Sequence, residues 1–83
     1  MSEEVWGLEE KARRVLQASA VESFGRAGVY VVMSEVMKRA NLSDPEEFRA
    51  IANYLEWQGW ITEADPEYGV FLLTTEGIDI AEH

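Results

Sequence analysis

Residues 44–61 of the chain read DPEEFRAIANYLEWQGWI, a stretch with a strong helix start and an amphipathic continuation. Asp44 is a favourable N-cap residue, Pro45 occupies the first helical position, and Glu47 follows the cap at the spacing of a capping box. We therefore expect a helix over residues 45–58. Its inward face is predicted to consist of Phe48, Ile51, Ala52 and Leu55.

The residue pattern changes its period after Gly59, a residue type that commonly ends helices. Two strand-like runs follow, WITEAD and VFLLT, and the PEYG segment between them favours a turn because it contains Pro and Gly. These runs predict a two-stranded hairpin over residues 60–74. The closing TEGIDIAEH predicts a short helix over 75–82, and the final His83 is either native or the remnant of an affinity tag.

The segment before residue 44 is predicted to form a helix, a short strand and a second helix. An i, i+3, i+4 pattern predicts the first helix over 8–24, ended by the glycines of FGRAG. The run VYVV predicts a strand over 29–32, and Ser34 is expected to cap a helix over 34–41. The inward positions of the two helices are Val5, Leu8, Ala12, Val15, Leu16, Ser19, Ala20 and Ser23 in the first, and Val36, Met37 and Ala40 in the second.

The size and composition of the chain limit its class. Eighty-three residues suffice for one domain, so residues 1–83 are expected to form a single unit. The absence of cysteine excludes disulfides, thiolate zinc sites and cysteine nucleophiles. No apolar run approaches the roughly 20 residues of a membrane-spanning helix, and the acidic MSEEVWGLEE is unlike a secretory signal. A cytoplasmic protein with no membrane association is therefore expected.

The negative charge of the chain is concentrated in its second half. Residues 1–40 contain six acidic and six basic residues, whereas residues 41–83 contain ten acidic residues and a single base, Arg49. The formal net charge of −9 therefore belongs entirely to the second half. Such asymmetry disfavours a polyanionic partner on that half of the molecule.

Three segments of the sequence occur in an order known from one protein family. They are the two-helix unit 34–61 with its tight turn, YLEWQGWI at 54–61, and LLTTEGIDIAE at 72–82. Together they resemble the winged helix-turn-helix family over roughly residues 8–82. The second segment is similar to the part of the family's sequence where the recognition helix ends at a glycine and the wing begins. The third is similar to a Leu-Thr-x-x-Gly stretch that often follows the wing. The resemblance implies an α+β fold, mostly α, with a three-helix core, a two-stranded wing and a short C-terminal helix.

By this resemblance the helix over 45–58 occupies the recognition-helix position, which in DNA-binding members lies in the major groove. Its outward positions include Asn53, whose side chain can pair with an adenine edge. A specific DNA binder neutralises about 6–10 phosphates, whereas this half of the chain offers one arginine and turns Glu46 and Glu47 toward them. The candidate nucleic-acid contacts are Lys38, Arg39, Arg49 and Asn53.

Trp57 is the most informative residue of this helix, because it lies opposite the predicted core face. Either the first helix or the C-terminal tail covers it, or it is an exposed aromatic anchor for a protein partner. Its neighbours Trp60 and Ile61 are expected to belong to the core. The candidate interaction surface comprises Glu46, Arg49, Ala50, Asn53, Tyr54 and Trp57.

No pattern in the sequence indicates catalysis, a cofactor, a metal or a small-molecule substrate. The single histidine is the last residue, and FGRAG lacks the Lys-Ser/Thr ending of a phosphate loop. The acidic groups Asp44, Glu46, Glu47, Asp65 and Glu67 lack EF-hand spacing and are interpreted as caps or solvated surface. The preferred function is a non-enzymatic protein-interaction module, as a homodimer or a subunit of a regulatory complex. The alternative is a DNA-binding transcriptional regulator.

Overall fold

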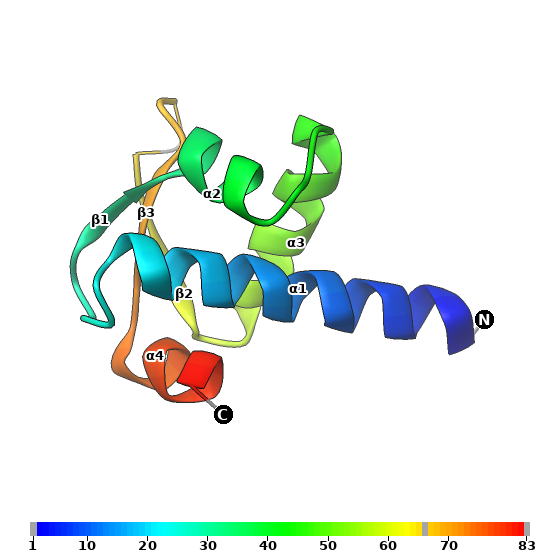
Figure 1. Cartoon of the computed structure of the whole chain (residues 1–83), viewed down its shortest axis with the longest axis horizontal. Helices are drawn as coiled ribbons and strands as arrows, with labels where there is room; N and C mark the ends of the chain where they lie inside the picture. The colour runs from blue at the N-terminus through cyan, green and yellow to red at the C-terminus, as the bar shows by residue number, and fades with distance from the viewer. Residues whose placement is uncertain (1, 66, 83) are drawn as a thin grey trace.

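The computed structural model describes residues 2–65 and 67–82, with the side chains of these residues from position 9 onward. His83, Pro66 of the expected turn, and the side chains of Val5 and Leu8 lie outside the described residues. The described part is an α+β structure dominated by helix (Figure 1). Its elements are α1 (Ser2–Glu22), β1 (Tyr30–Val32), α2 (Met33–Arg39), α3 (Pro45–Trp57), β2 (Ile61–Asp65), β3 (Val70–Leu73) and α4 (Thr75–Glu82).

The three strands form one antiparallel sheet in the order β1-β3-β2. Val31 of β1 is opposite Phe71 of β3, and Ile61 of β2 is opposite Leu73 of β3. These four apolar side chains are buried, so one face of the sheet contributes to the core. The register of β2 shifts between Glu63 and Asp65, close to the turn of the hairpin.

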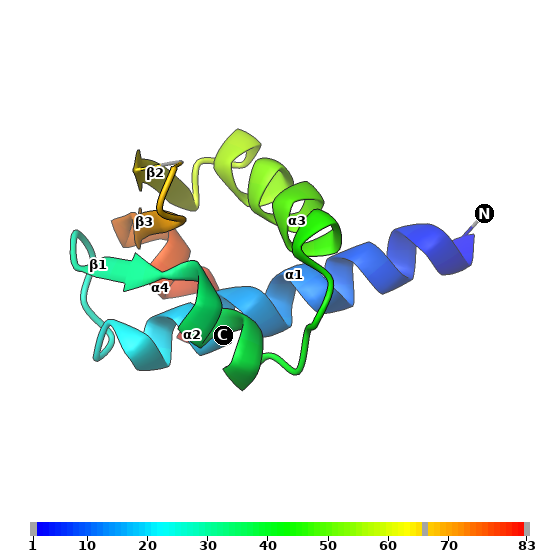
Figure 2. The same cartoon turned by 90° about the horizontal axis from the view of Figure 1, so that it is seen from above.

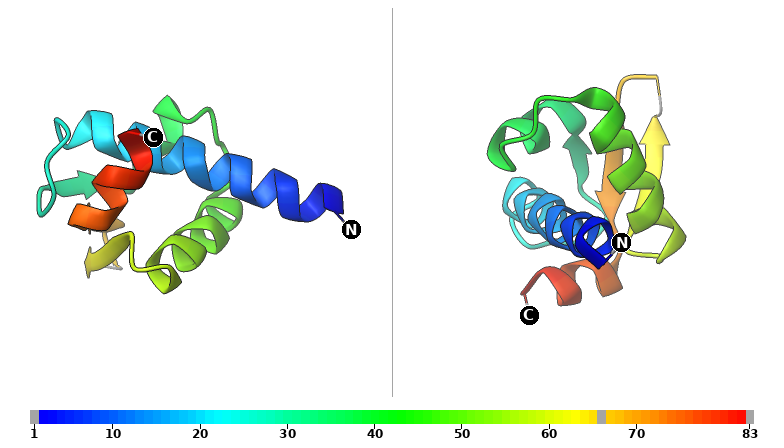
Figure 3. Two further views of the ribbon diagram at one scale, coloured as in Figure 1. Left: turned by 90° about the horizontal axis from the view of Figure 1, so that it is seen from below. Right: turned by 90° about the vertical axis from the view of Figure 1, so that its right-hand side faces the viewer.

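Helix α1 runs through the middle of the helical layer and packs against α2, α3 and α4. Figures 1 and 3 show α2 and α3 on one side of α1 and α4 on the other. Its buried positions are those that the i, i+3, i+4 pattern predicts, with Ala18 in addition and Ala20 only partly buried. The expectation for Val5 and Leu8 is not tested. The buried residues of α1 are Ala12, Val15, Leu16, Ala18 and Ser19, with Ser23 just beyond its end.

The start of α1 was predicted too late. The helix begins at Ser2 rather than residue 8. Its end is earlier than residue 24: Phe24 and Gly25 have positive φ angles of 59° and 70°. Figure 2 shows the first turns of α1 extending beyond the rest of the molecule.

Helix α2 does not begin with a serine cap, which corrects the expectation for Ser34. It begins at Met33, and the preceding Val32 is extended and makes no side-chain cap hydrogen bond. The N–H of Met33 instead donates to the carbonyl oxygen of Gly69 at 2.7 Å. A backbone carbonyl of the hairpin therefore pairs with one of the N–H groups that have no partner within the helix at its start. Val36, Met37 and Ala40 are buried as predicted.

Helix α3 begins at Pro45 and ends at Trp57, as the sequence predicts within one residue. Asp44 is its N-cap, and its Oδ1 accepts a hydrogen bond from the N–H of Glu46 at 3.0 Å. The expected capping box is not formed among the described residues, because Asp44 accepts from Glu46 rather than from Glu47. The Glu47 carboxylate instead accepts a hydrogen bond from Lys11 Nζ of α1. Ala52 is only partly buried. The fully buried apolar side chains of α3 are Phe48, Ile51 and Leu55.

The hairpin and α4 are joined by a network around Thr74. Its N–H donates to the carbonyl of Trp60 at 3.0 Å, and its hydroxyl donates to the carbonyl of Gly59 at 2.7 Å. The same hydroxyl accepts the N–H of Gly77 at 3.0 Å, which makes Thr74 the cap of α4. Thr74 therefore ties the end of α3 to the start of α4.

Gly77 of α4 lies directly against the backbone of Trp60, and this contact yields a stability prediction. A Cβ at this position would lie 2.0 Å from the carbonyl oxygen of Trp60, which is backbone and has little freedom to move. We expect Gly77→Ala to lower the free energy of unfolding by about 3 kcal/mol or more, despite the better helix propensity of alanine. Chemical denaturation measures this change.

Glu76→Ala is the control, because Glu76 is the exposed neighbour of Gly77 in the same helix. It should change stability by less than about 0.5 kcal/mol. Equal stability of Gly77→Ala and the parent chain would contradict the close approach of α4 to Trp60.

Candidate functional site

The outward face of α3 carries an exposed stripe that we call the α3 ridge: Glu46, Ala50, Asn53 and Trp57. Trp57 is 83% exposed, so neither α1 nor α4 covers it in the described structure. The reason is the helical period: Phe48, Ile51 and Leu55 bury the opposite side of α3. The ridge therefore contains a large aromatic side chain with no packing partner among the described residues.

Tyr54, a residue of the candidate interaction surface, does not lie on the α3 ridge. Its side chain is half-buried and packs edge-on against Trp60, with ring centroids 6.3 Å apart and an interplanar angle of 85°. It faces a hollow beside α1 that Arg13 and Leu16 also line. Tyr54 therefore supports the core around the end of α3. Ile61 is buried as expected, and Trp60 is half-buried against the core.

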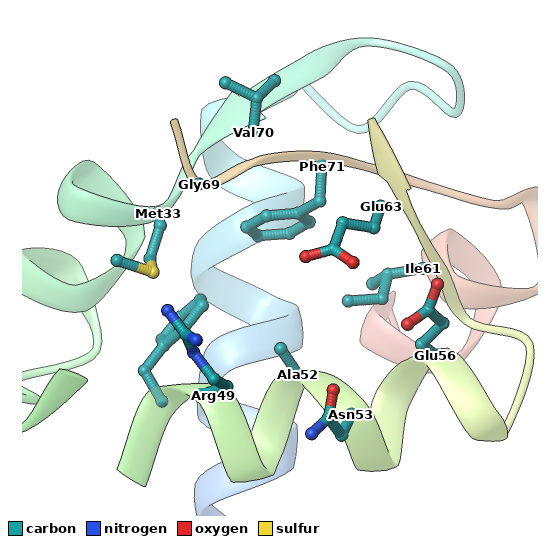
Figure 4. A pocket seen from close by; sticks show the side chains of 11 residues that line it. Met33, Arg49, Ala52, Asn53, Glu56, Ile61, Glu63, Gly69, Val70 and Phe71 are labelled. Carbon is teal, nitrogen blue, oxygen red and sulfur yellow. The ribbon is translucent and has the colours of Figure 1, made fainter. Parts of the chain in front are cut away.

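A cavity of about 280 Å³ lies between α3 and the β2–β3 hairpin, beside the ridge (Figure 4). We call it the hairpin groove. The buried rings of Phe48 and Phe71 form part of its floor, with centroids 6.1 Å apart and a tilt of 48°. Ile61 completes the apolar floor. Besides Phe48, α3 contributes Arg49, Ala52, Asn53 and Glu56 to the groove, at helical spacing.

One end of the groove is closed by the contact between α2 and the hairpin turn. Gly69 adopts a φ of +68°, and a Cβ there would lie 3.0 Å from the Cβ of Met33. Met33 lines the groove next to Gly69, and its N–H is bonded to the Gly69 carbonyl. The hairpin turn is therefore fixed to α2, which sets how far the hairpin stands from α3.

Charged side chains stand at both ends of the groove. In Figure 4, Arg49 lies toward Met33, whereas Glu56 and Glu63 lie toward Ile61. All three charged side chains are exposed, and none forms an ion pair or hydrogen bond with a residue that the structure describes. The groove thus offers an apolar floor with free charges of opposite sign at its ends.

The candidate nucleic-acid contacts are only partly brought together. Arg49 and Asn53 lie side by side on α3 at the groove. Lys38 and Arg39 stand on α2, and each is engaged with an acid: Lys38 Nζ lies 4.0 Å from Glu35, and Arg39 Nε donates to Glu22 at 2.8 Å. Their positive charge is therefore partly compensated within the molecule.

Two of the acidic side chains, Asp44 and Asp65, have local structural roles. Asp44 caps α3, and Asp65 Oδ1 accepts hydrogen bonds from the N–H groups of Glu67 and Tyr68 at 3.2 and 3.4 Å. Within residues 2–65 and 67–82, no three His, Cys, Asp or Glu side chains are grouped in a way that could hold a metal ion. No helix in the same ranges is long and apolar enough to cross a membrane.

Sequence reasoning missed the two glutamates of the groove. Glu56 follows Arg49, Ala52 and Asn53 at i+7, i+4 and i+3, so the spacing alone could have placed it on the same side of α3. Glu63 could not have been found this way, because its position depends on how the hairpin folds back toward α3. Five exposed apolar or aromatic side chains away from α3 were also missed: Val21, Phe24, Tyr30, Val32 and Tyr68.

Comparison with protein-family models, with curated proteins and with solved structures finds no match to this chain. The functional interpretation therefore rests on the residues and geometry described above.

The contrast between Trp57 and Trp60 yields a prediction. Trp57→Ala should change the free energy of unfolding by less than about 0.5 kcal/mol, because the side chain is exposed. Trp60→Ala should lower the free energy of unfolding by about 3 kcal/mol, because it removes the ring that packs against Tyr54 and against the edge of the core. Thermal and chemical denaturation of the two variants measure the difference. Equal destabilisation by the two substitutions would show that Trp57 is packed.

Proposed function

We propose that this chain is a non-enzymatic protein-interaction module with a winged-helix architecture, in which α3 takes the recognition-helix position and β2–β3 is the wing. The succession of α1, β1, α2, α3, hairpin and α4 supports this assignment, as does the three-stranded β1-β3-β2 sheet. The partner is a second copy of the chain or another subunit of a regulatory complex. The cytoplasmic location remains a prediction.

The observation that carries this proposal is the exposure of Trp57 on the α3 ridge. An aromatic side chain of this class buries 150–250 Å² when it is packed. At about 25 cal/mol per Å², a partner that covers it would gain about 4–6 kcal/mol before the costs of association. Aromatic residues in such positions are frequent hot spots of protein interfaces.

The charges of the same surface favour a protein over a nucleic acid. Glu46, Glu56, Glu63 and Glu67 are exposed on α3 and the hairpin, against the single base Arg49. A DNA backbone docked there would meet mostly negative charge, whereas phosphate neutralisation supplies most of the affinity for DNA. The exposed pair Arg49 and Asn53 is the one observation that favours the alternative, a DNA-binding regulator.

The ridge predicts the behaviour of Trp57→Ala in association. Sedimentation velocity over a range of concentrations measures self-association, and affinity capture with the immobilised chain measures a heterologous partner. Trp57→Ala should abolish either association, with a loss of about 2 kcal/mol or more in binding free energy.

Phe24→Ala is the matched control, because Phe24 is 85% exposed but lies in the turn after α1. This substitution should leave the association unchanged. Association that survives Trp57→Ala, or that is lost equally in Phe24→Ala, would contradict the proposed role of the ridge.

The charge distribution predicts the result of a DNA titration. At near-physiological salt, the chain should not bind random-sequence duplex DNA with a dissociation constant below about 10⁻⁴ M, which is the weak limit of binding through phosphate contacts alone. An electrophoretic shift titration at two salt concentrations measures this. Micromolar binding that weakens steeply with salt and disappears in Lys38→Glu/Arg39→Glu would favour the regulator instead.

A further inference from the structure

The hairpin groove has the size and lining of a site for one inserted side chain. Its volume of about 280 Å³ is at the lower end of the sizes typical of small-molecule pockets, about 300–1,000 Å³. Its floor is apolar, and the rings of Phe48 and Phe71 beneath it are held against each other. A large apolar side chain from a peptide therefore suits the size and the apolar floor of the groove.

The charge at the groove is predominantly negative. Glu56 reaches it from α3 and Glu63 from β2, both at the end near Ile61 in Figure 4. Neither carboxylate is compensated by an ion pair within the described residues. Glu46 and Glu67 add further exposed negative charge on α3 and the hairpin turn. A ligand that places a cation at the Ile61 end would bring it toward both Glu56 and Glu63, whose charges attract it.

We propose that the hairpin groove binds a basic peptide segment of the protein partner, with an apolar side chain on the Phe48–Phe71 floor and an adjacent lysine or arginine at Glu56 and Glu63. This inference rests on the proposed function and specifies the chemistry of the partner. Asn53 belongs to both the groove and the α3 ridge. The bound segment therefore continues over Asn53 toward Trp57, so that groove and ridge form one contact surface.

The position of Arg49 determines the orientation in which a charged peptide binds. It stands at the opposite end from the two glutamates, beside Met33. A second cation of the peptide is repelled there, and an acidic or uncharged residue is accepted. The segment therefore binds with its basic residue toward Ile61 and its other end toward Met33.

The experiment uses the whole ¹⁵N-labelled chain and three blocked peptides that differ only in the residue after leucine: Ac-AAQLKAA-NH₂, Ac-AAQLQAA-NH₂ and Ac-AAQLEAA-NH₂. Backbone amide shifts in titrations report both affinity and location. The lysine peptide should bind with a dissociation constant of about 1 mM or lower. Its shifts should concentrate at Arg49, Ala52, Glu63 and Val70. The glutamate peptide should bind least.

A matched pair of variants separates the local effect from the overall charge. Glu56→Gln/Glu63→Gln removes the two groove acids, whereas Glu9→Gln/Glu76→Gln removes two exposed acids on α1 and α4. The groove variant should weaken binding of the lysine peptide about fivefold, and the control less than about twofold. Arg49→Gln should strengthen it by about twofold, since a repulsive charge is removed.

Three results would overturn the inference: no groove shifts at millimolar lysine peptide, equal binding of the glutamate peptide, or equal weakening by the two double variants. In each case the association test with Trp57→Ala still decides the proposed function independently. If Trp57→Ala abolishes self-association but the peptides do not bind, the proposal of an interaction module stands and the proposal of a basic peptide segment is wrong.

Discussion

The burial of one apolar stripe of α3 determines the arrangement of the rest of the molecule. Phe48, Ile51 and Leu55 occupy successive turns of the helix and are almost completely shielded from solvent. Their burial fixes the rotation of α3 about its own axis, and the 100° advance per residue then assigns every other side chain. The ridge with Trp57 is turned outward, and Arg49 and Glu56 are turned toward the hairpin. The candidate site is thus a geometric consequence of the core.

The position of the hairpin depends on backbone contacts rather than on side-chain packing alone. At one end, the Gly69 carbonyl accepts the N–H of Met33. At the other end, Thr74 bonds to the carbonyls of Gly59 and Trp60. Because both ends of the hairpin are held, the groove beside α3 exists before any ligand binds. A preformed site loses less conformational entropy on binding than one that must first be ordered.

Much of the fold could be predicted from the sequence because local signals and core patterning agree. Asp44 and Pro45 mark the start of α3 to the residue, and the inward positions of α1 and α3 follow from helical spacing. The start of α2 could not be predicted, since a carbonyl from a distant turn satisfies its first N–H group. The exposure of Trp57 was one of two open alternatives and is resolved by the structure. The groove escaped prediction because Glu63 and Glu56 are neighbours only in three dimensions.

The Leu-Thr-x-x-Gly stretch at residues 73–77 has a purely steric and capping explanation in this molecule. Leu73 is completely buried, Thr74 caps α4, and Gly77 leaves room for the carbonyl of Trp60. Any chain that brings its last helix this close to the residue before the hairpin faces the same restriction on side-chain size. The motif therefore reports how the last helix docks, and it carries no information about the ligand. A substitution at Leu73, Thr74 or Gly77 would therefore act first on the docking of α4 and leave the side chains of the groove and the ridge unchanged.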